Sequence, residues 1–152
     1  MKAIIIGSTG ATGTELTLQL LDHKNFNEVH IFVRSIPKIN HPKLNVHKVD
    51  FNEINTWSEK LKGDVLFLAM GTTLKTARSK EAQYKVDVTY QFESAKAAAN
   101  NKVPKLILVS SIGANHKSIF FYPKIKGLLE EMVKNLNFKS ICILRPPVLD
   151  RG

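Results

Sequence analysis

Three glycines near the start of the chain, at positions 7, 10 and 13, constrain its fold more than any other feature. The loop that contains them reads Gly7-Ser8-Thr9-Gly10-Ala11-Thr12-Gly13. Glycine has no Cβ, so this backbone can turn tightly and approach a phosphate group, and the helix that follows offers unpaired N–H groups to an anion. The spacing is G-x-x-G-x-x-G rather than the commoner G-x-G-x-x-G, and a purely structural turn is the alternative. Its place directly after the apolar run Lys2–Ile6 favours a loop that binds a dinucleotide's pyrophosphate.

Apolar runs alternate with helical patterns along the chain, which is typical of a parallel sheet covered by helices on both faces. The expected strands are 2–6, 29–33, 44–49, 65–70, 106–109 and 141–144, and the expected helices are 14–23, 55–61, 80–100 and 123–136. Right-handed crossovers then predict an α/β fold of three layers, a doubly wound Rossmann-type sheet of order 3-2-1-4-5-6. The chain has 152 residues and no linker-like stretch, so we expect one nucleotide-binding domain over residues 1–152.

The end of the second expected strand indicates which nucleotide is bound. In folds that bind NAD, an acidic residue about 20 positions after the glycine loop contacts the ribose 2′-hydroxyl. Arg34 stands at that distance from Gly13, and Ser35 follows it. A guanidinium makes forked hydrogen bonds to phosphate, and a serine hydroxyl adds a donor. The pattern therefore predicts NADP(H) as the cofactor, with an ordinary surface arginine as the alternative.

Further cofactor contacts are expected at two other strand ends, because ligands of open α/β sheets lie across the carboxyl ends of the strands. The residues at these ends are Asp50, Phe51, Ala69, Met70, Gly71 and Thr72. Gly71 would let the chain pass close to the cofactor. The Asp50 carboxylate either accepts a hydrogen bond from the adenine amino group or caps a turn.

Candidate reacting residues follow the fifth strand. Tyr122 and Lys126 are four positions apart in an expected helix, so they share one face of it. A neighbouring ammonium stabilises the phenolate form of a tyrosine, which helps that side chain to exchange a proton near neutral pH. A serine hydroxyl upstream, at Ser111, can hold a substrate oxygen. Ser110 is the alternative, because two adjacent serines leave the register open, and a coincidental surface pair is the alternative for Tyr122 and Lys126.

Together, the glycine loop, Ser110-Ser111 and Tyr122-x-x-x-Lys126 resemble the atypical short-chain dehydrogenases/reductases, and most of all the HIV Tat-interacting-protein-like oxidoreductases and their bacterial relatives. The resemblance implies NADP(H) binding by the glycine loop. It implies that Tyr122 is the acid/base, that Lys126 is its charge partner and a cofactor ribose ligand, and that Ser111 is the ligand of the substrate oxygen. The expected function is hydride transfer between NADP(H) and a small carbonyl or alcohol substrate; the alternative is an NADP(H)-sensing binding protein without catalysis. A homodimer is one option.

Two departures from this family matter. The main subfamily carries an asparagine of a proton relay in the helix after the fourth strand, where this chain has Asp87. Family members also continue beyond the sixth strand, and that continuation builds much of the substrate pocket. We therefore expect residues 1–152 to lack a C-terminal substrate-binding extension.

Composition excludes several other classes of protein. The net charge of +9 is scattered, without a nucleic-acid motif, so we expect no nucleic-acid partner. No apolar run is long enough to span a membrane. The five histidines lack metal-ligand spacing, so no metal is expected. Cys142, the one cysteine, is expected in the core, and the absence of any internal disulfide predicts a reducing, cytoplasmic location.

Overall fold

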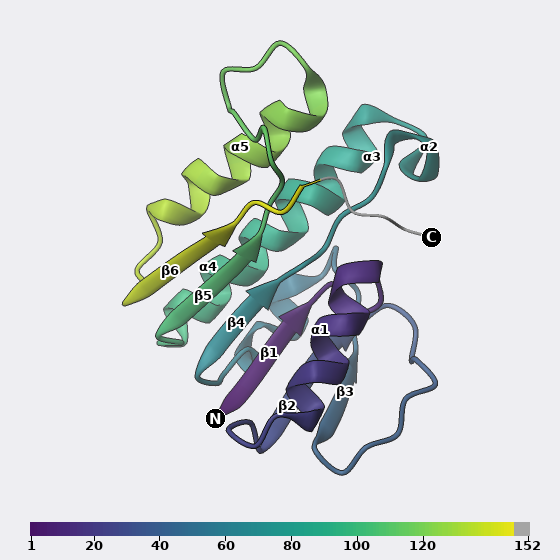
Figure 1. Cartoon of the computed structure of the whole chain (residues 1–152), viewed down its shortest axis with the longest axis vertical. Helices are drawn as coiled ribbons and strands as arrows, with labels where there is room; N and C mark the ends of the chain where they lie inside the picture. Colours follow the sequence, from purple (N-terminus) through teal and green to yellow (C-terminus); the bar gives the residue numbers. More distant parts are fainter. Residues whose placement is uncertain (148–152) are drawn as a thin grey trace.

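Runs of isoleucine, valine and leucine form a parallel sheet, because such side chains pack well on a pleated surface that is covered by helices. In the computed structural model, which describes residues 1–147, six strands lie in the order β3-β2-β1-β4-β5-β6 (Figure 1). Their bounds are β1 Lys2–Ile6, β2 Glu28–Val33, β3 Leu44–Lys48, β4 Val65–Leu68, β5 Lys105–Val109 and β6 Ser140–Leu144. All neighbours pair in parallel, so the predicted doubly wound Rossmann-type sheet is confirmed.

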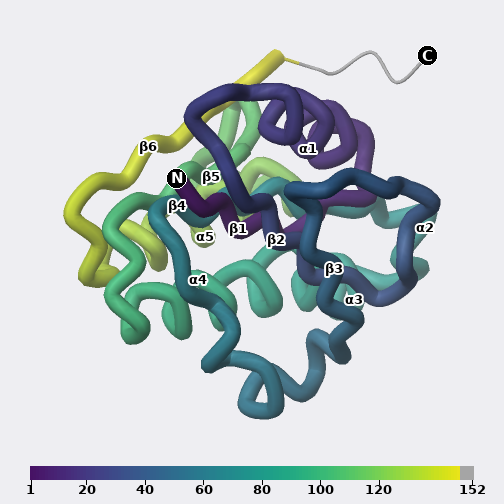
Figure 2. Tube along the Cα trace, turned by 90° about the horizontal axis from the view of Figure 1, so that it is seen from below, coloured from purple at the N-terminus to yellow at the C-terminus, as the bar shows by residue number. Residues whose placement is uncertain are grey.

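Helices lie on both faces of this sheet. Those within residues 1–147 are α1 Ala11–Asp22, α2 Leu74–Ala77, α3 Lys80–Tyr84, α4 Gln91–Asn100 and α5 Phe121–Lys134. The first of them, α1, covers one face, while α4 and α5 cover the other (Figures 1 and 2). The part of the chain that the structure describes contains no helix both long and apolar enough to span a bilayer.

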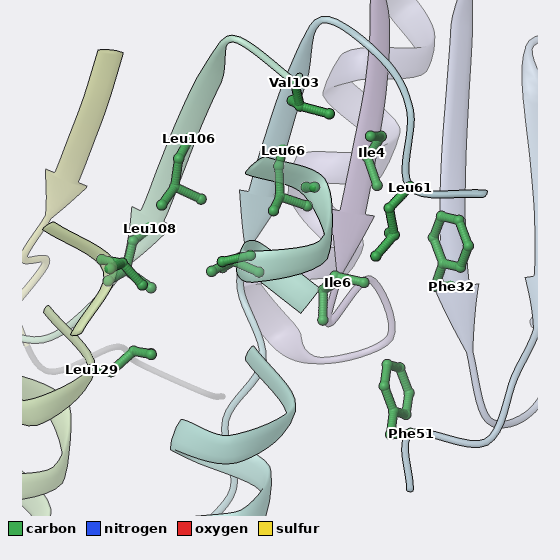
Figure 3. Packing of buried hydrophobic residues seen from close by; sticks show 14 of the residues in the cluster. Ile4, Ile6, Phe32, Phe51, Leu61, Leu66, Val103, Leu106, Leu108 and Leu129 are labelled. Carbon is green, nitrogen blue, oxygen red and sulfur yellow. The ribbon is translucent and has the colours of Figure 1, made fainter. Parts of the chain in front are cut away.

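Two apolar layers, one on each side of the sheet, hold the strands in place. Successive residues of a strand point to opposite faces. Ile4 and Ile6 therefore pack in the layer beneath α4 and α5, together with Leu66 and Leu108 (Figure 3). Ile5 packs in the other layer, against α1. The end of β1 is thus fixed from both faces, and this fixes the position of the glycine loop that follows it.

The helices differ most from the predicted ones in four places, and α5 also begins and ends two residues earlier than the expected 123–136. The first helix begins at Ala11, three residues earlier than the pattern suggests, because Gly10 is its extended N-cap. The expected helix 55–61 is two separate 3₁₀ turns. The expected helix 80–100 is interrupted by π-helical turns at Lys85–Tyr90. A short helix, α2, was not expected; Thr73 caps it by accepting a hydrogen bond from the N–H of Thr76 at 3.1 Å.

The expectation that Cys142 lies in the core is wrong, because its side chain is exposed. Its strand, β6, lies at the edge of the sheet and pairs only with β5 within the described residues. Ile143, on the opposite face, packs against the apolar layer beneath α5. An apolar run therefore predicted the strand but not that one of its faces is open.

Candidate functional site

A cavity of about 550 Å³ opens at the carboxyl ends of β1, β2 and β4. Most of the strand-end residues named from the sequence line it: Gly7, Ser8, Thr9, Gly10, Arg34, Ser35, Phe51, Ala69, Met70, Gly71 and Thr72. Parallel strands bring these segments together although they are far apart in the chain. Ala11, Thr12 and Gly13 are not among the lining residues; they form the first turn of α1 behind the loop.

Two glycines of the loop are required by close backbone contacts. Gly7 has φ +93°, which L side chains rarely adopt, and a Cβ there would collide with the backbone of Ala69 and Met70. A Cβ on Gly13 would overlap the carbonyl oxygen of Gly7. Gly10 differs, because the nearest atom to its Cβ position is 3.9 Å away. Gly7 and Gly13 thus allow the loop backbone to pack closely against neighbouring backbone. Gly10 lines the cavity, and the absence of its side chain leaves space there.

The start of α1 fits a phosphate group. No side chain caps its first turn, so the amide N–H groups there have no side-chain acceptor. The Ser8 hydroxyl is buried and has no hydrogen-bond partner among the described residues. Helix N-termini with open amides bind anions readily. The loop residues present therefore fit the pyrophosphate of a dinucleotide.

The adenosine end of the cavity is basic and aromatic. Arg34 and Ser35 are exposed at the end of β2, and Arg34 is the only charged residue that lines the cavity within residues 1–147. Phe51 stacks on Tyr90 with ring centroids 5.5 Å apart. Asp50 does not line the cavity; its Oδ1 accepts a hydrogen bond of 2.9 Å from the Asn52 N–H, which is the turn-capping alternative.

Three buried side chains hold the loop that follows β4. Gln91 Oε1 accepts a hydrogen bond from the Met70 N–H at 3.1 Å, and Asp87 Oδ1 accepts one from the Thr72 N–H at 2.8 Å. Gln83 Nε2 donates to the Thr72 carbonyl at 3.3 Å. Gln83, Asp87 and Gln91 are 3%, 0% and 0% exposed. The backbone that lines this side of the cavity is therefore set by side chains of the helical stretch 80–100.

The two serines after β5 have different surroundings. Ser110 is buried, and its hydroxyl has no hydrogen-bond partner among the described residues, although it lies near enough to the Glu130 carboxylate on α5 to influence the pKa of that group. Burial raises the pKa of the Glu130 carboxyl, but the hydrogen bonds of Arg145 and the hydroxyl of Ser110 outweigh burial and hold that pKa below its usual value. Ser111 is half-buried, and its hydroxyl donates to the carbonyl of Ile112 at 3.2 Å. Ser111 is thus the more accessible hydroxyl on this rim.

Tyr122 and Lys126 share one face of α5, as their spacing predicts. The Lys126 Nζ lies 5.8 Å from the centroid of the Tyr122 ring. Tyr122 is 42% exposed, whereas Lys126 is 5% exposed and interacts electrostatically with Asp87. Burial raises the pKa of the Asp87 carboxyl, while the Lys126 charge and the Thr72 N–H oppose that rise. None of Ser111, Tyr122 and Lys126 lines the cavity described above.

Sequence reasoning missed seven residues that line the cavity: Phe32, Val33, Thr76, Ala77, Ala82, Val86 and Tyr90. Most of them come from α2, α3 and the π-helical turns. Thr73 and Ser79, each followed three residues later by the N–H that it caps, are the sequence signal for these two helix starts. Within residues 1–147, no group of three or more His, Cys, Asp or Glu side chains is placed to hold a metal ion.

The parallel sheet, the glycine loop and the open helix start define a dinucleotide-binding Rossmann domain. Residues 7–150 match the family described as NAD(P)H-binding. The chain therefore belongs to the NAD(P)H-binding family.

Curated relatives carry the name FMP52. The chain is 38% identical to "Protein FMP52-1, mitochondrial" of Scheffersomyces stipitis, over 98% of this chain and 67% of that protein. It is 35% identical to "Protein FMP52, mitochondrial" of Meyerozyma guilliermondii, over 98% of this chain and 65% of that protein. The chain thus spans about two thirds of the length of these relatives.

The names of these relatives contradict the cytoplasmic location expected from the sequence. The physical reason is that a lone cysteine rules out an internal disulfide and does not distinguish one reducing compartment from another.

Solved structures share the fold at low sequence identity. "MoeE5 in complex with UDP-glucuronic acid and NAD" has a TM-score of 0.77 and 16% identity, over 95% of this chain and 54% of that one. The UDP-glucuronic acid 4-epimerase from Bacillus cereus in complex with NAD has a TM-score of 0.77 and 17% identity, over 97% and 56%. Such identities support the fold alone. The narrower resemblance to the HIV Tat-interacting-protein-like oxidoreductases stays a prediction.

Proposed function

We propose that this chain binds NADP(H) and transfers hydride between it and a small carbonyl or alcohol substrate. The observation that carries the proposal is the charge of the cavity, whose only charged lining residue among residues 1–147 is Arg34. A carboxylate at this strand end would repel a ribose 2′-phosphate, whereas a guanidinium binds one through forked hydrogen bonds. Ser35, beside it, adds a hydroxyl donor.

The chemistry follows from the three residues after β5. Bound NADPH would supply a hydride to the carbonyl carbon of the substrate. The Tyr122 hydroxyl donates the proton that the substrate oxygen then needs, and the Ser111 hydroxyl donates a hydrogen bond to that oxygen. The Lys126 ammonium, close to the Tyr122 ring, stabilises the phenolate that proton donation produces. The curated relatives are longer than this chain, so the activity of a full-length protein is also part of this proposal.

An NADP(H)-sensing protein without catalysis is the second candidate. The observation that favours it is the position of Tyr122, which is 42% exposed and does not line the cavity. A sensor needs only the nucleotide cavity.

The names of the FMP52 relatives also support a mitochondrial location for the chain, which fractionation of cells that express it would check.

Titration of the chain with NADPH and with NADH tests the cofactor. We expect Arg34→Ala to weaken NADPH binding about 10- to 100-fold, and NADH binding by less than about threefold, because only NADPH carries the 2′-phosphate. Lys24→Ala removes an exposed charge outside the cavity and serves as the matched control. Equal losses for both nucleotides in Arg34→Ala would refute the phosphate role.

Oxidation of NADPH with a panel of carbonyl compounds separates enzyme from sensor. We expect turnover in the parent chain and a loss of at least about 100-fold in Tyr122→Phe, which keeps the ring and lacks the proton. Turnover that Tyr122→Phe leaves unchanged would remove Tyr122 from the reaction. NADPH binding without turnover on any compound would favour the sensor.

A further inference from the structure

Backbone hydrogen bonds on both sides of Ser111 hold it against the end of β6 and the chain that follows. The Ser110 N–H donates to the Leu144 carbonyl at 2.7 Å. The Ile112 N–H donates to the Pro146 carbonyl at 3.0 Å. These two bonds continue the pairing of β5 with β6 past the end of β5. The position of Ser111 therefore depends on where this part of the chain lies.

Arg145 stands between the two accepting residues, and its side chain is fixed to α5. Its Nε and one Nη atom donate hydrogen bonds of 2.8 and 2.6 Å to the two carboxylate oxygens of Glu130. The Glu130 side chain is 2% exposed. Two parallel hydrogen bonds fix the direction of a guanidinium as well as its distance. The chain beside Ser111 is thus held to a buried group of α5.

Glu130 shares a helix face with the other candidate reacting residues. Tyr122, Lys126 and Glu130 follow one another at steps of four residues along α5, so their side chains lie on the same side of the helix. Lys126 and Glu130 are both buried there. The Glu130–Arg145 pair therefore joins the segment before α5, which carries Ser111, to this side of the helix.

The segment after Ser111 is attached to the same helix at its other end. The Asn115 N–H donates to the Pro123 carbonyl at 2.9 Å. Gly127 lets this loop approach α5 closely, because a Cβ there would overlap the backbone of Asn115. Ser111 thus lies between two attachments to α5, one through Arg145 and one through Asn115.

We infer that the Glu130–Arg145 pair fixes the position of the Ser111 hydroxyl relative to the side of α5 that carries the other reacting residues. In the proposed reaction, the hydroxyls of Ser111 and Tyr122 must reach the same substrate oxygen, so a small shift of either lowers the rate. Glu130 and Arg145 are thus positioning residues that act through Ser111. Neither lines the nucleotide cavity, so their effect falls on kcat rather than on the Kd for NADPH. This role deepens the proposed function and rests on it.

Arg145→Lys tests this role, because an ammonium keeps the charge opposite Glu130 but lacks the second, parallel hydrogen bond. We expect the kcat for carbonyl reduction to fall about tenfold, and the Kd for NADPH to stay within about twofold of the parent value. Glu130→Gln, which has one acceptor oxygen in place of two, should have the same effect and keeps the test open should Arg145→Lys fail to fold. Lys134→Met removes an exposed ion pair with Glu131 on the same helix, and as the control it should leave kcat unchanged. An unchanged kcat in folded Arg145→Lys and Glu130→Gln would overturn the inference.

A double-mutant cycle on kcat separates the positioning of Ser111 from a general loss of structure. In Ser111→Ala, the hydroxyl that Arg145 positions is absent, so adding Arg145→Lys should lower kcat by less than about twofold further. A general loss of structure would give the same tenfold fall whether or not the Ser111 hydroxyl is present. An equal fall in both backgrounds would therefore overturn the positioning role.

Amide hydrogen exchange tests the attachment of the Ser111 segment without any need for activity. The Ile112 N–H, which donates to Pro146, should exchange at least about tenfold faster in Arg145→Lys than in the parent chain, while the amides of β1, inside the sheet, keep their rates. Unchanged exchange at Ile112 would overturn the inference. A parent chain that binds NADPH but reduces no carbonyl would refute the proposed reaction and the catalytic half of the inference. Faster exchange at Ile112 would then still support the attachment through Arg145.

Discussion

The imidazole rings of His30 and His47 are joined by a hydrogen bond of 2.9 Å between Nδ1 of His30 and Nε2 of His47. The rings stack with centroids 5.1 Å apart on neighbouring strands, β2 and β3. One ring donates and the other accepts, so the pair requires at least one neutral imidazole. Burial lowers the pKa of both histidines. The charge of Lys2 lowers the pKa of His30 further, while Glu28 raises it. The charges of His30 and Lys2 lower the pKa of His47 further.

We therefore expect the free energy of unfolding to fall as the pH drops below about 6.5. The histidines of the unfolded chain take up protons near that pH, whereas the lowered pKa values keep the folded pair neutral, so acid favours the unfolded chain. His47→Gln should reduce the fall in Tm between pH 7.5 and 5.5 by roughly 2–4 °C, which corresponds to about 1 kcal/mol in a domain of this size. The exposed His116, changed to Gln, is the control. Equal pH dependence in the parent and in His47→Gln would contradict the prediction.

Arg145 makes two hydrogen bonds to Glu130, of 2.8 Å from Nε and 2.6 Å from an Nη atom. The Glu130 side chain is only 2% exposed, so Arg145→Met leaves a buried carboxylate without its partner. We expect this change to lower the free energy of unfolding in urea, because the buried carboxylate loses both hydrogen bonds. Glu130→Met combined with Arg145→Met should cost less than Arg145→Met alone, because no buried charge remains. A double variant less stable than Arg145→Met would argue against this explanation.

Alanine at the two loop positions 13 and 10 should affect different properties: stability at the first and nucleotide binding at the second. Gly13→Ala should destabilise the fold by several °C in Tm, because its Cβ overlaps the backbone of Gly7. Gly10→Ala should leave Tm nearly unchanged, since its Cβ has room, but should weaken NADPH binding at least about tenfold by filling space that a phosphate would take. Thermal unfolding and nucleotide titration on the same samples check both. Tight binding by Gly10→Ala would remove this loop from the phosphate contact.

The two serines can be told apart by alanine substitution. Ser111→Ala should lower kcat about 100-fold with little change in the Kd for NADPH, because the half-buried hydroxyl is available to a substrate oxygen. Ser110→Ala should leave kcat nearly unchanged, since its hydroxyl is buried away from solvent near the Glu130 carboxylate. A larger loss of kcat in Ser110→Ala would assign the role to Ser110 instead.

The sheet was predictable because its strands are marked twice, by apolar β-branched residues and by the glycine or polar residues that end them. β1 and β3 begin at the residues the sequence predicts, and all six strands pair in the expected order within residues 1–147. The cavity walls at the glycine loop and at Arg34 followed from the same signals. These features depend on local sequence and on the right-handed crossovers between parallel strands. Neither requires knowledge of contacts between distant side chains.

The parts that escaped prediction depend on packing between distant segments. Gln83 and Gln91 are polar residues in a helical pattern, where they read as surface positions; only the approach of Met70 and Thr72 makes them buried partners. Cys142 reads as a core residue because an apolar run does not reveal that β6 is an edge strand. Location within the cell is a matter of targeting rather than of packing, and composition gave no correct answer.

The π-helical turns at Lys85–Tyr90 keep the three loop-holding side chains in phase. In an α-helix, a step of four residues overshoots a full turn by about 40°, so residues 83, 87 and 91 would spiral away from a straight backbone. Wider turns, closed by i→i+5 hydrogen bonds, rotate less per residue and cancel that drift. Deleting one residue from this stretch would rotate Gln91 away from Met70 relative to Gln83 and Asp87. The wider turns thus keep Gln83, Asp87 and Gln91 on one side of the helical stretch, and the position of the loop backbone that lines the cavity depends on them.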